Sequence, residues 1–121
     1  MAEVRTSSSR EPSLGKNPTV SSLILSSLAG GEKHGYALVK DVEAFAGVRV
    51  PPGTLYEALE RLQGAGLIEA LDSDDRRRPY RLTAVGAEAL AEHLKTQRQI
   101  VRTGLQRLRV GWSLTPNGEL A

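Results

Sequence analysis

The stretch PPGTLYEALERLQGAGLIE, residues 51–69, decides the fold of this chain. Its apolar residues recur at the spacing of one helix face: Leu55, Leu59 and Leu62. Pro52 suits a first helical position, because its missing N–H would be unpaired there in any case. Thr54 and Glu57 have the spacing of a capping box, so the helix alternatively begins at Thr54. We predict a helix from Pro52 to Gln63, ended by glycines.

A short apolar strand, Leu67 to Asp72, follows this helix, and a second one runs from Tyr80 to Thr83. Three consecutive cations lie between the two strands: Arg76, Arg77 and Arg78. A helix followed by a hairpin with a basic tip is typical of proteins that place the helix in a DNA groove and a cationic wing on the phosphates.

The composition describes an ordinary globular chain. It has 121 residues, of which 40% are hydrophobic and 25% charged, and it has no cysteine. This length suits one domain, and the missing cysteines exclude disulfides and thiolate metal sites. No apolar run reaches the roughly 20 residues that cross a bilayer. Because residues 1–17 have no apolar signal core, we expect a disordered tail there and a cytoplasmic location.

The net charge of +2 is weak evidence for nucleic acid, so the distribution of charge matters more. Five cations lie between residues 95 and 109 without an acidic residue among them. The arginine triplet is partly neutralised by three acids just before it: Asp72, Asp74 and Asp75. Each cluster alone is typical of a solvated surface. The triplet gains significance from its place at a hairpin tip.

Two helices are expected before the decisive stretch. Asn17-Pro18 resembles an N-cap followed by a first-turn proline, and Gly30-Gly31 ends that helix. The second helix runs from about His34 to Ala46, with Gly47 as its left-handed stop. We expect three apolar residues inward, Leu38, Val42 and Phe45, and three charged residues outward, Lys40, Asp41 and Glu43. A glycine at position 35 lowers the stability of the helix, and close approach by a neighbouring backbone would explain why a glycine is present.

A fourth helix follows Thr83, its expected N-cap, and no proline interrupts the chain before Pro116. About 28 residues of helix extend roughly 40 Å, more than so small a domain needs to cover its core. We therefore expect the helix to pair with a second copy of itself; folding back over its own domain is the alternative. The dimer residues are Leu90, Leu94, Val101, Leu105 and Leu108.

The predicted fold class is mainly α with a small β-hairpin: a winged helix-turn-helix plus a long C-terminal helix. Several segments resemble the PadR family of bacterial transcription regulators. They are Ile24 to Leu28 leading into His34-Gly35-Tyr36, then Gly53-Thr54-Leu55-Tyr56, Gly66-Leu67-Ile68 and Tyr80-Arg81-Leu82-Thr83 with Gly86 and Leu90. The resemblance covers about Ile24 to Leu94 and implies a DNA-binding regulator, expected to be a repressor.

The single helix after the wing is similar to the shorter PadR-like subgroup, in which that helix dimerises. Two features depart from the family pattern. Glu57 stands where the family often has proline, and Asp74-Asp75 makes the wing less cationic. The resemblance also implies release by a small aromatic or hydrophobic effector. Packing in the core or dimer accounts for Trp112, on the apolar stripe, and the alternative is that it lines such an effector pocket.

Six residues are candidates for DNA contact: Thr54, Tyr56, Arg61, Arg76, Arg77 and Arg78. The resemblance places residues matching Thr54 and Tyr56 at the DNA surface. For Arg61 we expect an ion pair with Glu57 in the free protein and a phosphate contact in the complex. The three arginines of the triplet suit phosphates better than bases.

His34 and His93 lack metal-ligand spacing, and His34 is expected to cap its helix or make a polar contact. No motif for phosphate cradling or nucleophilic catalysis is present, so neither a cofactor nor an enzyme is expected. The alternative function is a winged-helix module that binds proteins and not DNA. The expected organisation is a tail over residues 1–17, a DNA-binding domain over 18–83, a dimerisation helix over 84–112 and a flexible tail over 113–121.

Overall fold

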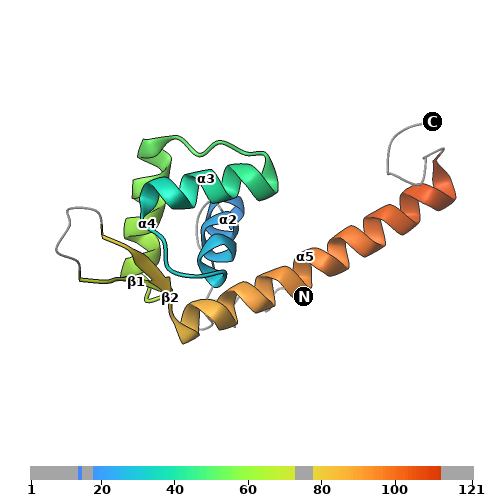
Figure 1. Ribbon diagram of the computed structural model, residues 1–121. Coiled ribbons are helices and arrows are strands. Elements are labelled where there is room, and N and C mark those ends of the chain that lie inside the picture. Colours follow the sequence, from blue (N-terminus) through green and yellow to red (C-terminus); the bar gives the residue numbers. More distant parts are fainter. Residues whose placement is uncertain (1–13, 15–17, 73–77, 113–121) are drawn as a thin grey trace. The chain divides into compact units, whose positions relative to one another are not determined.

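The computed structural model describes residues 14, 18–72 and 78–112 (Figure 1). In chain order they form α2 (Pro18–Ala29), α3 (Gly35–Ala46), α4 (Pro52–Gly64), β1 (Ile68–Ala70), β2 (Tyr80–Leu82) and α5 (Ala84–Gly111). The predicted fold class is confirmed: three helices are followed by an antiparallel hairpin and a long helix. The chain packs as two compact units, Met1–Ala91 and Glu92–Ala121, so the first turns of α5 belong to the same unit as the other helices and the hairpin.

The core of the first unit is built from aliphatic side chains of α2, α3, α4 and β1. Its most deeply buried members are Ile24, Leu25, Leu38, Val42, Leu59, Leu62, Leu67 and Ile68. Leu90 of α5 also belongs to this core. The prediction that Leu90 contributes to a dimer is therefore corrected: its side chain is already covered within its own chain.

Leu14 is a second correction. We expected it in a disordered tail, but its side chain is buried in the same core. The other residues that were predicted to form the two tails lie outside the described residues, as does the predicted N-cap Asn17.

The helix ends largely follow the expected chemistry. α4 begins at Pro52 and not at Thr54, since the Leu55 N–H already bonds the Pro51 carbonyl at 2.9 Å. Gly47 ends α3 in the left-handed conformation, at φ 68°. Thr83 caps α5, because its Oγ1 accepts a hydrogen bond from the Gly86 N–H at 3.0 Å.

Two side chains of α3 point differently from the prediction. Phe45 was expected inward but is 52% exposed, because it lies in the last turn, next to residues 46–49, which are also exposed. Asp41 was expected outward but is half-buried, and it accepts a hydrogen bond from the buried Ser27 hydroxyl of α2 at 2.7 Å. Lys33 lies 4.0 Å from the same carboxylate, so a polar cluster joins α2 to α3.

We call residues 67–83 the wing. Its two strands pair with Glu69 opposite Arg81, and they are shorter than predicted. Tyr80 also exchanges two backbone hydrogen bonds with Lys33, in the connection between α2 and α3. The wing is thereby fixed to the helical part of the first unit. Among the described residues, no helix has the length and apolar character needed to cross a membrane.

Candidate nucleic-acid interface

The exposed face of α4 is the centre of the candidate interface. Leu55, Leu59 and Leu62 are buried on one side of the helix, as predicted. The opposite side exposes Gly53, Tyr56, Glu57, Glu60, Gln63 and Gly64. Thr54 lies between the two sides and is half-buried. We call the four side chains Tyr56, Glu57, Glu60 and Gln63 the reading face.

Tyr56 is 55% exposed, but its hydroxyl end lies against α3. A Cβ atom added to Gly35 would lie only 2.8 Å from the Tyr56 hydroxyl oxygen. We predicted that Gly35 makes room for a neighbouring backbone. It makes room for the Tyr56 side chain instead. This contact places the hydroxyl end of Tyr56 against the first turn of α3.

Arg61 does not pair with Glu57, so that prediction is wrong. Its guanidinium turns toward α2, where one Nη donates to the Ser21 hydroxyl at 3.3 Å and to the Leu14 carbonyl at 3.4 Å. The Ser21 hydroxyl in turn donates to the Leu14 carbonyl at 3.1 Å. Because Ser21 and Leu14 are buried, Arg61 connects α4 to the core and is not on the reading face.

Glu60 was missed by the sequence analysis, although its spacing from Glu57 contained the signal. Residues three apart in a helix lie on the same side, so Glu57 and Glu60 expose two carboxylates together. Within the described parts of the chain, neither forms an ion pair. With Arg61 turned inward, the reading face holds two negative charges and no cation.

The arginine triplet of the wing is described only in part. Arg78 is exposed, whereas Arg76 and Arg77 lie outside the described residues. Arg81 is not free for phosphate: its Nη2 and Nε lie 2.6 and 2.9 Å from the Glu69 carboxylate. This hydrogen bond, with the charge of Glu69, raises the pKa of the Arg81 guanidinium above its usual value. The pair therefore connects β1 to β2 where Glu69 and Arg81 lie opposite each other.

Two neighbouring side chains of α3, Tyr36 and Lys40, are also exposed, and of these the sequence analysis had placed only Lys40 outward. Tyr36 is exposed, and the Lys40 Nζ lies 5.8 Å from the centre of its ring. A cation at this distance from an aromatic face is weakly attracted to it. The signal in the sequence was the spacing of four residues, which brings side chains together on a helix.

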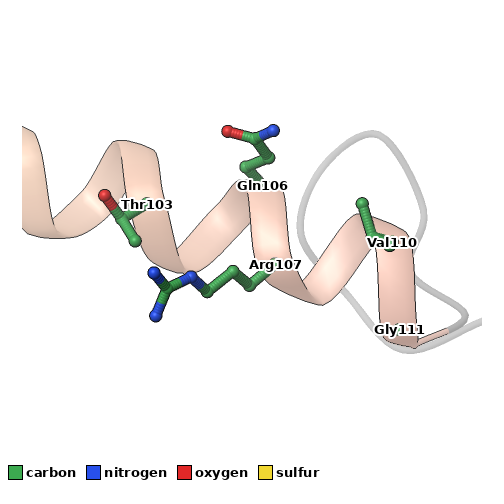
Figure 2. Close-up of a pocket in the computed structure, with 5 residues that line it drawn as sticks. All are labelled: Thr103, Gln106, Arg107, Val110 and Gly111. Atoms are coloured by element: carbon green, nitrogen blue, oxygen red, sulfur yellow. The ribbon is translucent and has the colours of Figure 1, made fainter.

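The second unit exposes the apolar stripe of α5. Leu94, Val101, Leu105 and Leu108 are between 37% and 54% exposed, and their spacings of seven, four and three place them on one side of the helix. Trp112, just after the helix, is also exposed. A hollow on α5 is lined by Thr103, Gln106, Arg107, Val110 and Gly111, and Trp112 is not among its lining residues (Figure 2).

No metal site emerges from the described parts of the chain, where no group of three or more histidine, aspartate or glutamate side chains is placed to hold an ion.

The first unit has three packed helices, a short hairpin and an exposed third helix, which define a winged helix-turn-helix protein. The chain belongs to the transcriptional regulator PadR-like family, whose model matches residues 24–92.

The chain is also similar to individual known proteins. The chain is 40% identical over 82 residues to the transcriptional regulator Rv3488 of Mycobacterium tuberculosis, covering 65% of this chain and 76% of that protein. It is 44% identical over 68 residues to an uncharacterized 37.1 kDa protein in transposon TN4556 of Streptomyces fradiae. That match covers 56% of this chain and only 20% of the Streptomyces protein.

Among solved structures, the chain resembles a PadR family transcription regulator from Clostridium difficile, with 29% identity and a TM-score of 0.67. The alignment covers 74% of this chain and 97% of the clostridial one.

Proposed function

We propose that this protein is a homodimeric, DNA-binding transcriptional repressor. α4 enters the major groove, where Thr54 and Tyr56 contact the DNA, and the wing lies on the backbone through Arg76, Arg77 and Arg78. The stripe on α5 pairs two copies. The observation that carries the proposal is the exposed reading face of α4 on a fold that belongs to a regulator family.

Arg61 is left out of the proposed contacts. A phosphate contact would require its guanidinium to give up the hydrogen bonds to Ser21 and Leu14. An effector remains part of the proposal: a small aromatic or hydrophobic molecule that changes the dimer geometry and separates the two recognition helices. The exposed ring of Trp112 supports a stacking contact with such a molecule.

The experiment that tests DNA binding is a fluorescence anisotropy titration with a random duplex, repeated over a salt series. Phosphate contacts release counterions, so the affinity should fall steeply as salt rises. Arg78→Ala should weaken binding to every duplex and reduce the salt slope by about one. Arg109→Ala, which removes the same charge from an exposed position on α5, is the matched control and should change the slope less.

The negative charge of the reading face is the observation that favours the second candidate, a winged-helix module that binds proteins and not DNA. The same titration decides between the two. Absence of binding at low salt, for both random and genomic duplex fragments, would exclude the DNA-binding function and leave the protein-binding module.

A further inference from the structure

We propose that Glu57 and Glu60 determine sequence preference by accepting hydrogen bonds from the amino groups of cytosines in the major groove. The inference rests on the proposed function, because it requires α4 to enter that groove. It goes further in naming the bases that this particular helix selects, which follow from the side chains on its exposed side.

The first step of the argument is which groups can reach a base. Besides the apolar Pro52 ring, the described side chains that project from the exposed side of α4 are Tyr56, Glu57, Glu60 and Gln63. Arg61, the only cation of α4, is half-buried and bonded to Ser21 and Leu14. The contact between arginine and guanine, which is the commonest specific contact to DNA, is therefore not available to this helix.

The second step is the chemistry of the two carboxylates. An ionised carboxylate only accepts hydrogen bonds, so it needs a donor on the base edge. In the major groove cytosine presents only its N4 amino donor, whereas adenine presents an amino donor beside the N7 acceptor, and thymine presents an oxygen acceptor. A carboxylate therefore attracts cytosine and repels thymine. It also repels phosphates, so the helix gains little from DNA of arbitrary sequence.

The third step is spacing. Glu57 and Glu60 are three residues apart in α4, which corresponds to about 4.5 Å along the helix axis. Successive bases of one strand are about 3.4 Å apart. The two carboxylates therefore reach bases that are neighbours or separated by one position. A preferred half-site should contain two cytosines at this spacing.

The experiment begins with selection of preferred duplexes from a random library by the full chain. Each cytosine in the recovered site is then replaced in turn by thymine, with adenine opposite, and affinities are measured by fluorescence anisotropy. The wild-type protein should lose at least about fivefold in affinity at each of two cytosines. Glu57→Ala should abolish the cytosine preference at one of them, and Glu60→Ala at the other.

Both alanine variants should also bind random duplexes more tightly, because each removes a negative charge from the groove. Glu88→Ala, which removes an exposed carboxylate from α5, is the matched control and should leave both cytosine preferences intact. If both α4 variants keep the wild-type ratio of cytosine to thymine affinity, the inference is overturned while DNA binding stands. If the wild-type protein binds no duplex and enriches no sequence, the proposed function itself fails, and the inference with it.

Discussion

At the scale of single residues, three helical glycines show how the surrounding atoms decide the effect of a glycine-to-alanine substitution on the free energy of unfolding. At Gly86 an added Cβ would overlap the backbone carbonyl of Leu67 and come within 2.9 Å of a Leu82 methyl group. At Gly35 the nearest atom is the hydroxyl of Tyr56, an exposed side chain that can swing aside. At Gly104 an added Cβ would have no described atom within 4 Å apart from the adjacent residues and backbone of its own helix.

Gly86→Ala should therefore destabilise the first unit by about 1–3 kcal/mol, because a backbone carbonyl held between wing and helix cannot move away easily. Gly35→Ala should cost less than Gly86→Ala. Gly104→Ala is the control and should raise stability by up to about 1 kcal/mol, since alanine is the better helix former. Urea denaturation followed by circular dichroism measures all three. Equal effects of Gly86→Ala and Gly104→Ala would show that α5 does not pack on the Leu67 carbonyl.

At the scale of elements, the order and type of the helices and strands could be predicted because they depend on local signals. Leucines at helical spacing predicted α4, Gly47 predicted the end of α3, and Thr83 predicted the start of α5. The predictions that were wrong concern contacts between elements. The acceptor of Arg61 at Leu14 lies 47 residues away in sequence, and no local pattern indicates it. Phe45 fits the inward face by periodicity, but periodicity does not show that its turn lies beyond the core.

The contact between Arg61 and α2 leads to a prediction that separates support of the fold from DNA recognition. Arg61→Ala should lower the free energy of unfolding by about 1–3 kcal/mol, because hydrogen bonds from a charged donor to Ser21 and Leu14 are lost. The preferred DNA sequence should stay the same, because the side chain is not on the reading face. Arg49→Ala, at an exposed position, is the control and should leave stability nearly unchanged. If the folded Arg61→Ala protein prefers different bases, the prediction is wrong and Arg61 contacts the DNA.

At the scale of the whole molecule, the proposed repressor depends on pairing through the second unit. Two winged units on one dimer can bind two half-sites about 34–36 Å apart, and a monomer reads only one of them. The stripe of Leu94, Val101, Leu105 and Leu108 is exposed in the single chain, and exposed leucines at regular helical spacing gain stability when they are buried against a second copy.

Val101→Glu should convert the dimer into a monomer, because it places an unpaired charge in the centre of the apolar stripe. Sedimentation equilibrium at micromolar concentration measures the mass, and anisotropy with a two-half-site duplex should show a loss of affinity of at least about tenfold. The unfolding of the first unit should be unchanged, since Val101 is not among its core residues. Gln106→Glu is the matched control: it adds the same charge in the hollow, away from the stripe, and should leave the dimer intact (Figure 2). A wild-type protein that sediments as a soluble monomer would contradict the dimer, and DNA binding would then have to be explained with a single winged unit.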